Sequence, residues 1–163
     1  AGFGTKELAY DPFVEAATMQ QAGVTKVDSL TELARQVDVL SVHAPLSKAT
    51  QHLVNSKVLA AMQPHAIVVN TSRGGLIDEA ALIAALQAGR IAGAGLDVFE
   101  QEPPAADNAL KKFDNVVMSP HVAGVTEDSL RGMAMNVADV VDNVFAGRQP
   151  ATLLNAQIWE RRK

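Results

Sequence analysis

Short apolar runs rich in Val, Ile and Leu alternate with amphipathic helical patterns along nearly all of this 163-residue chain. That order is typical of βαβ units, in which parallel strands are joined by crossover helices. The length fits one domain with its own hydrophobic core. The sequence therefore predicts an α/β fold built on a doubly wound parallel sheet.

The expected elements follow from their end signals. Ser29 with Glu32 three residues later is typical of a capping box, and Gly89 and Gly147 follow helical patterns as stop signals. Proline near a helix start, at Pro12, indicates a first turn. We expect strands at residues 6–10, 24–27, 39–43, 66–70, 92–98 and 116–119, and helices at 12–22, 29–37, 56–62, 78–88 and 126–146.

Composition excludes several classes of partner. The formal net charge is -4, so nothing in the overall charge favours nucleic acid or anionic lipid. Without cysteine there is no disulfide, thiolate nucleophile or Cys-based zinc site, which is compatible with a cytoplasmic protein. We expect no membrane span, because no apolar run approaches the roughly 20 residues required. A chain that begins with Ala1 suggests processing, proteolysis or a fragment.

Polar residues that directly follow strands are the candidate site. In an open parallel sheet, ligands bind beyond the carboxyl ends of the strands, where loops and helix N-termini converge. The stretches that qualify are "YDP", "VHAPL", "NTSRGG" with "LDVFEQEPP", and "SPHVAG".

Asp11 ends the first expected strand. In a dinucleotide-binding fold, an acid at the end of the second strand accepts hydrogen bonds from ribose hydroxyls and repels a 2'-phosphate, which favours NAD over NADP. The alternative is an Asp-Pro turn whose side chain starts the next helix. Taken alone, the local sequence favours the turn.

Arg73 follows a strand and precedes Gly74 and Gly75. Its guanidinium matches a carboxylate bidentately, and the glycines would let a ligand approach the backbone. An arginine paired with a protein acid is an equally good interpretation of the same residues.

Glu102 and His121 lie in proline-containing loops after neighbouring strands. A histidine held by a carboxylate can act as a general acid and base. A capping histidine and a solvated glutamate are the alternative for each residue taken singly.

The other histidines give weaker signals. His65 and His52 are expected at the surface, whereas His43 could line the cleft but is better explained as a packed, hydrogen-bonded core residue. We expect no metal, because none of the four histidines forms a close ligand pair with another.

The order of these motifs is more specific than any one of them. The segments "DVLSVHAPLSKATQHLVN", "MQPHAIVVNTSRGGLIDEAALIAALQAGRIAGAGLDVFEQEPP" and "NVVMSPHVAGVTEDS" together closely resemble the D-isomer-specific 2-hydroxyacid dehydrogenase family, including its phosphoglycerate and glycerate dehydrogenases. The resemblance runs from "LAYDPF" through the last long helix.

The resemblance implies a Rossmann-like NAD-binding domain, a small 2-hydroxy or 2-oxo acid as substrate, and a homodimer formed through the cofactor domain. It implies Arg73 as the substrate-carboxylate arginine, His121 as the catalytic histidine and Glu102 as the residue that orients it. Asp11 matches the ribose-binding acid and Asp97 the aspartate near the nicotinamide carboxamide. The expected cofactor-binding residues are Asp11, Ala44, Thr71, Ser72, Arg73, Asp97, His121 and Gly124.

The chain also departs from the family. Its ribose acid is already at position 11, and "AGFG" leads into a strand rather than following one, so we expect an N-terminally truncated domain without its first strand and GxGxxG loop. Residues 1–147 would be the partial cofactor domain with its long inter-domain helix, and 148–163 a tail returning to a missing substrate domain.

Two consequences are expected of such a chain. Loss of the central first strand leaves two unpaired strand edges within the sheet. Loss of the phosphate loop weakens cofactor binding, so these residues alone should be inactive. The alternative is a non-enzymatic interaction module of dehydrogenase descent.

Overall fold

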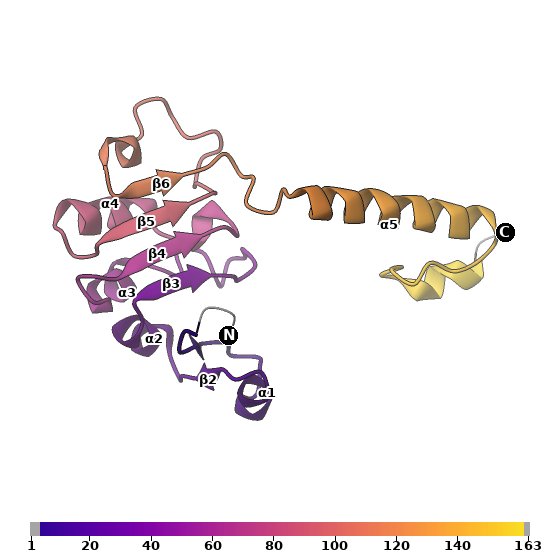
Figure 1. Ribbon diagram of the computed structural model, residues 1–163, viewed down its shortest axis with the longest axis horizontal. Helices are drawn as coiled ribbons and strands as arrows, with labels where there is room; N and C mark the ends of the chain where they lie inside the picture. The colour runs from indigo at the N-terminus through magenta and orange to yellow at the C-terminus, as the bar shows by residue number, and fades with distance from the viewer. Residues whose placement is uncertain (1–3, 162–163) are drawn as a thin grey trace. The chain divides into compact units, whose positions relative to one another are not determined.

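The computed structural model describes residues 4–161, which form two compact units, Ala1–His121 and Val122–Lys163. The first unit carries alternating strands and helices, drawn from indigo to orange in Figure 1. Its elements are β1 (Leu8–Ala9), α1 (Ala16–Gln21), β2 (Thr25–Lys26), α2 (Leu30–Gln36), β3 (Val39–Val42), α3 (Ser56–Ala61), β4 (Ile67–Asn70), η1 (Gly74–Leu76), α4 (Glu79–Gln87), β5 (Gly93–Leu96), η2 (Ala109–Lys112) and β6 (Val116–Met118).

The strands form two separate parallel sheets. β3, β4, β5 and β6 are neighbours in that order, whereas β1 pairs with β2 in a sheet of its own. Figure 1 shows the four-stranded sheet as a stack of arrows. In the doubly wound order, a first strand would lie between the strands that correspond to β1 and β3. The predicted parallel α/β fold is confirmed, and so is the predicted division of its sheet.

Helices α2 and α4 begin at the capping residues that the sequence predicts, and each buries its apolar face. Ser29 Oγ accepts a hydrogen bond from Glu32 N–H at 3.2 Å at the start of α2, and Asp78 Oδ1 accepts one from Ala81 N–H at 2.9 Å at the start of α4. Leu33 and Ala34 of α2 are buried, as are Leu82 and Leu86 of α4. These side chains join the core formed by Leu40, Val42, Val58, Leu59, Val68, Leu76, Ile91, Ala94 and Leu96.

The first predicted helix was placed too early. It begins at Ala16 rather than at Pro12, after a bend over residues 12–14. Asp11 Oδ1 accepts a hydrogen bond from Phe13 N–H at 2.8 Å, which forms a local turn in place of the first helical turn. The Phe13 side chain is 92% exposed, so a longer helix would have gained no buried surface there.

The second unit consists mainly of α5 (Glu127–Phe145), followed by η3 (Ala156–Arg161). Thr126 and Ser129 form a capping box in which each side chain accepts a hydrogen bond from the other residue's N–H. All 19 residues of α5 are described, and none is buried. Among its valines, Val137 and Val141 are exposed and Val140 and Val144 are half-buried. None of the helices described within residues 4–161 combines the length and apolarity needed to cross a membrane.

Candidate active site

Arg73 lies on a turn whose backbone is held by the buried side-chain amide of Asn70. Asn70, which is 1% exposed at the end of β4, donates from Nδ2 to Arg73 O at 2.9 Å and accepts from Ser72 N–H at 3.0 Å. Ser72 Oγ donates to Val42 O at the end of β3 at 2.8 Å. The backbone of the turn is therefore held by two strands, while the Arg73 residue stays exposed.

His121 and Glu102 form a hydrogen-bonded pair. His121 Nδ1 lies 2.9 Å from Glu102 Oε2, and Glu102 Oε1 accepts a hydrogen bond from Phe99 N–H at 3.0 Å. These contacts hold the pKa of the Glu102 carboxyl below its ordinary value, with the His121 hydrogen bond as the larger cause and the Phe99 amide as the next. The pair leaves the Nε2 side of the imidazole for another partner.

The backbone at His121 adopts an uncommon conformation. Its φ is 58°, in the left-handed region that non-glycine residues rarely occupy. Its N–H donates to Asp97 O at 2.9 Å, and Asp97 Oδ1 accepts from Ser119 Oγ at 2.6 Å. Asp97 is buried at 3% exposure and thus ties the end of β5 to the segment after β6. Such a backbone at the ends of two strands is typical of a functional site.

Two adjoining cavities lie on either side of this pair. One, of about 360 Å³, is lined by Arg73, Gly74, Glu102 and His121 together with Leu46, Gln51, Gly75, Phe99 and Glu100. The other, of about 440 Å³, is lined by Asp97, Glu102, Ser119 and His121 together with Phe99, Pro103, Pro104, Met118 and Pro120. The structure thus brings an arginine on a held turn and a carboxylate-bound imidazole to one cavity.

Gly74 and Gly75 allow close packing within the protein at this turn. A Cβ on Gly74 would overlap the backbone carbonyl of Phe99, and one on Gly75 would lie 3.3 Å from the Leu46 side chain. Both glycines also line the cavity of about 360 Å³, so the approach of a ligand to their backbone stays a prediction.

Asp11, Ala44 and Thr71 are not among the residues that line these two cavities. Asp11 follows β1 and forms the local turn that the alternative interpretation of "YDP" predicts, but its side chain does not start α1, whose N-cap is Glu15. Ala44 and Thr71 follow β3 and β4, at the carboxyl end of the sheet. Gly124 belongs to the second unit, where its carbonyl accepts a hydrogen bond from Ser129 Oγ at 2.7 Å.

The remaining histidines are all at least partly exposed. The interpretation of His43 as a core residue was wrong: the residue is exposed, and its Nε2 lies 2.9 Å from Ser41 Oγ. His65 is exposed as predicted, with Nε2 2.7 Å from Asp38 Oδ1. His52 is only partly exposed and pairs with Glu100 at 2.9 Å, which the sequence analysis did not foresee.

Sequence reasoning also missed Asn70 and Ser119 as residues that support the site. Both are polar residues at or next to the carboxyl end of a strand, and Asn70 lies in an otherwise apolar run. A polar side chain inside a buried strand must find hydrogen-bond partners there. This requirement for partners could have identified Asn70 from the sequence as a residue that supports the site.

A parallel sheet with polar side chains at the carboxyl ends of its strands is typical of α/β proteins that bind ligands, nucleotides among them, at that edge. Residues 1–123 match the family model of the D-isomer specific 2-hydroxyacid dehydrogenase NAD binding domain. The chain therefore belongs to this family, and NAD is the cofactor of the domain that the family model describes.

Known relatives agree with this assignment. The chain is 46% identical over 140 residues to a D-3-phosphoglycerate dehydrogenase of Archaeoglobus fulgidus, with 86% of this chain and 26% of the relative covered. A crystal structure of D-lactate dehydrogenase with NAD+ from Lactobacillus jensenii is similar with a TM-score of 0.85 and 31% identity, covering 94% of this chain and 49% of that one.

A third relative differs in its cofactor. The NADPH-dependent glyoxylate/hydroxypyruvate reductase of Sinorhizobium meliloti, in complex with NADP and malonate, is similar with a TM-score of 0.83 and 36% identity, covering 99% of this chain and 49% of that one. The chain thus spans less than half the length of each of these three relatives.

Proposed function

We propose that this chain is the greater part of the cofactor-binding domain of an NAD-dependent D-2-hydroxyacid dehydrogenase, which interconverts a 2-hydroxy acid and its 2-oxo acid. The observation that carries the proposal is the cavity of about 360 Å³ that Arg73, Glu102 and His121 line together. A guanidinium and a general acid-base beside one cavity suit a substrate that bears a carboxylate next to a hydroxyl or carbonyl group.

In this mechanism Arg73 binds the substrate carboxylate and His121 moves the proton. The imidazole takes the proton of the hydroxyl group during oxidation and returns it to the carbonyl oxygen during reduction. Glu102, through its 2.9 Å contact with Nδ1, fixes the ring orientation and stabilises the imidazolium. Positioning by the two loops supplies much of the rate, because the reacting groups are held before the reaction begins.

The residues at the carboxyl ends of the strands fit part of NAD. The carboxylate of Asp11 suits ribose hydroxyls and disfavours a 2'-phosphate, so we propose NAD rather than NADP. Asp97, Thr71 and Ser72 would add further polar groups to hold the cofactor. Bound NAD supplies the two-electron redox chemistry at the substrate carbon, while the residues of this chain bind and orient the substrate and handle its proton.

We further propose a cytoplasmic homodimer. The absence of cysteine from the sequence is compatible with that location, and the family resemblance supports pairing through the cofactor domain. Analytical ultracentrifugation of the complete polypeptide that carries these residues tests the dimer: a monomer at micromolar concentration would contradict it.

Substitution of Arg73 tests the enzymatic proposal. In the complete polypeptide, Arg73→Ala should lower kcat/KM for 2-oxo acids such as glyoxylate or hydroxypyruvate by about 100-fold or more, since a charged hydrogen-bonded pair is lost. Arg73→Lys keeps the charge but not the fork of donors, and should recover only part of this loss. The assay follows NADH absorbance over a range of substrate concentrations.

Two results would contradict the proposal. An unchanged kcat/KM for Arg73→Ala would remove Arg73 from the substrate site. A folded wild-type protein that binds NADH but turns over none of a panel of 2-oxo acids would favour the non-enzymatic interaction module instead.

A further inference from the structure

Residues 46–52 enclose one side of the turn that carries Arg73. His52 N–H donates to Gly75 O at 2.8 Å, and the Leu46 and Gln51 side chains face the Cα of Gly75, 3.3 Å and 3.6 Å from the position of a Cβ. This segment therefore follows the surface of the turn closely, with a backbone hydrogen bond at one end and side-chain packing along its length.

The opposite side of the same turn is enclosed by the loop that leads to Glu102. The backbone of Phe99 fills the space where a Gly74 side chain would lie. Phe99 N–H also donates to Glu102 Oε1, so the same residue contacts the Arg73 turn and supports the partner of His121.

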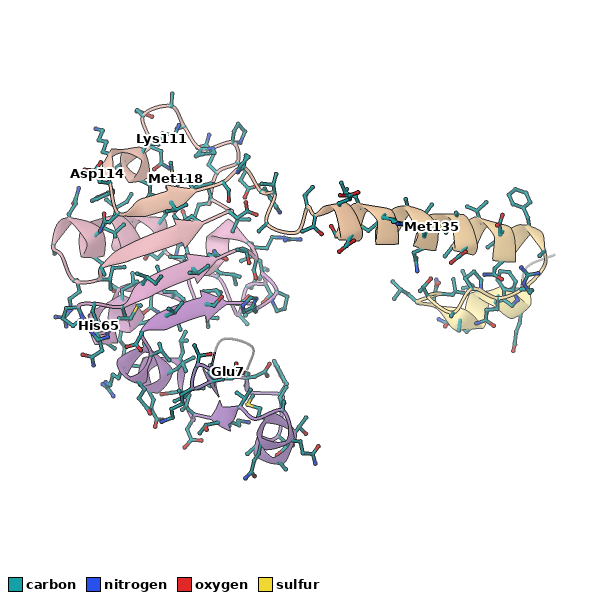
Figure 2. The ribbon with its side chains drawn as sticks, viewed as in Figure 1. Glu7, His65, Lys111, Asp114, Met118 and Met135 are labelled. Carbon is teal, nitrogen blue, oxygen red and sulfur yellow. The ribbon has the colours of Figure 1, made fainter. Side chains whose placement is uncertain are left out.

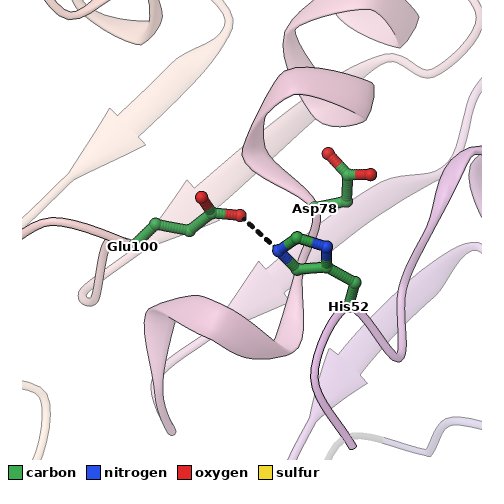
Figure 3. Close-up of side chains that lie close together, drawn as sticks. All are labelled: His52, Asp78 and Glu100. Atoms are coloured by element: carbon green, nitrogen blue, oxygen red, sulfur yellow. Dashed lines mark ion pairs between the residues drawn. The ribbon is translucent and has the colours of Figure 1, made fainter.

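One side-chain pair joins the two enclosing segments. His52 Nε2 lies 2.9 Å from Glu100 Oε1, and Figure 3 shows this contact. Glu100 Oε1 also accepts a hydrogen bond from Glu79 N–H at 3.0 Å, at the first residue of α4. The pair thus links residues 46–52 to the loop that leads to Glu102. Through Glu100, it also connects both segments to the first residue of α4.

His52 is held in a conformation that its neighbours must maintain. Its φ is 52°, in the left-handed region, where a non-glycine residue is strained unless its surroundings fix it. Its N–H bond to Gly75 and its ring contact with Glu100 supply those restraints.

The cluster that includes Asp78 is held together by the protein's own hydrogen bonds. The ligand atoms of His52, Asp78 and Glu100 lie within 4.8 Å of one another (Figure 3). Asp78 Oδ1 caps α4, and Glu100 Oε1 already contacts both His52 and the Glu79 amide. All three side chains therefore already make contacts within the protein.

We propose that His52 and Glu100 are positioning residues that clasp the Arg73 turn between residues 46–52 and the loop ending at Glu102. The clasp fixes the Arg73 backbone relative to His121 and so sets the affinity for the substrate carboxylate. The inference rests on the proposed function, because Arg73 is taken to bind that carboxylate. Its expected signature is a change in KM with kcat nearly retained.

The central test is His52→Asn in the complete polypeptide. Asparagine tolerates the left-handed backbone but is too short to reach Glu100 as histidine does. KM for the 2-oxo acid should rise about tenfold with kcat within twofold of the wild type, because a displaced Arg73 weakens substrate binding. A purely structural role would instead lower the fraction of active enzyme, which reduces apparent kcat and leaves KM unchanged.

Glu100 supplies a second, independent variant with a conservative rescue. Glu100→Ala should raise KM as His52→Asn does, whereas Glu100→Gln keeps an oxygen for His52 and the Glu79 amide and should restore most of the affinity. The KM of the double variant His52→Asn/Glu100→Ala should be no higher than that of the single variant with the higher KM. Both substitutions remove the same contact between His52 and Glu100, so their effects should not add.

The matched control is His65→Asn. His65 also pairs with a carboxylate, Asp38, at 2.7 Å, but it lies before β4 at the amino end of the sheet (Figure 2). Its KM and kcat should equal those of the wild type.

The outcomes separate the two proposals. An active wild type whose KM is unchanged in both His52→Asn and Glu100→Ala overturns the clasp alone. A wild type without turnover on 2-oxo acids overturns the proposed function itself.

Discussion

Glu102 shows how single contacts set the chemistry of this site. Its carboxylate accepts hydrogen bonds from the His121 ring and the Phe99 amide, and both lower its pKa from an ordinary value of 4.5. A group whose pKa is lower in the folded state stabilises that state at pH values above its unfolded pKa. The stabilisation is lost as pH falls through the folded pKa.

This linkage predicts a pH-dependent effect of Glu102→Gln. The variant should be less stable than the wild type at pH 7, and the difference in free energy of unfolding should shrink as the pH falls below about 4.5, the ordinary value. Urea unfolding followed by circular dichroism between pH 7 and pH 3 measures it. A difference that stays constant over this range would show that the contacts do not favour the ionised carboxylate.

Gly74 is the position in the turn where a side chain is least tolerated. Gly74→Ala should destabilise the protein by about 1–3 kcal/mol or more, because the new Cβ would overlap the Phe99 carbonyl and force the backbones apart. Gly95→Ala in β5 is the control, since its Cβ would meet Val69 at an ordinary 3.7 Å. Thermal unfolding of the two variants compares them, and equal melting temperatures would contradict the expectation.

Residues differed in how far the sequence revealed them. Glu102 and His121 were predicted as a pair because both follow strands, and strand ends meet at one edge of a parallel sheet. The His52–Glu100 pair was not predicted, because His52 lies in a loop whose path depends on packing against the Arg73 turn. Loop side chains far apart in sequence carry no periodic signal that would place them together.

Helices with strong end signals were predicted more accurately than those without them. The predicted bounds of α4 and α5 agree with the structure to within one residue, because Asp78 and Thr126 cap them and a glycine follows each. The start of α1 was wrong by several residues, since its N-cap, Glu15, makes no side-chain capping bond. Local hydrogen bonding by Asp11 overrode the proline signal there.

The capping box of α5 gives a prediction for that helix. Thr126→Ala removes the acceptor for Ser129 N–H and should cost about 1 kcal/mol of helix stability. Gly132→Ala, in the same helix with open space around the new Cβ, should stabilise it by a similar amount. Amide hydrogen exchange along α5 distinguishes them: slower exchange in Thr126→Ala would contradict the role of the cap.

The whole molecule is defined by the division of its parallel strands into two sheets. Within the described residues, β1 pairs only with β2, and β3 only with β4. The order of strands along the chain was predictable from periodicity. Which strands pair with each other in a divided sheet depends on long-range contacts, and a local sequence pattern does not contain them.

We also predict that these 163 residues alone bind the cofactor weakly. The chain has no GxGxxG loop to surround a pyrophosphate with backbone N–H groups. Isothermal titration calorimetry should therefore detect no micromolar NADH binding to the isolated chain, whereas the complete polypeptide should bind in that range. Micromolar binding by the isolated chain would show that the other contacts suffice.

Within the described residues, β1 and β3 each lie at an end of their own sheet, so each has an edge at which a further strand can pair. A separate peptide that supplies a parallel strand, followed by a glycine-rich turn and a helix, should therefore add to these edges. Mixing the two pieces would make sheet assembly report directly on encounter, and the return of nucleotide binding in trans would be its signal.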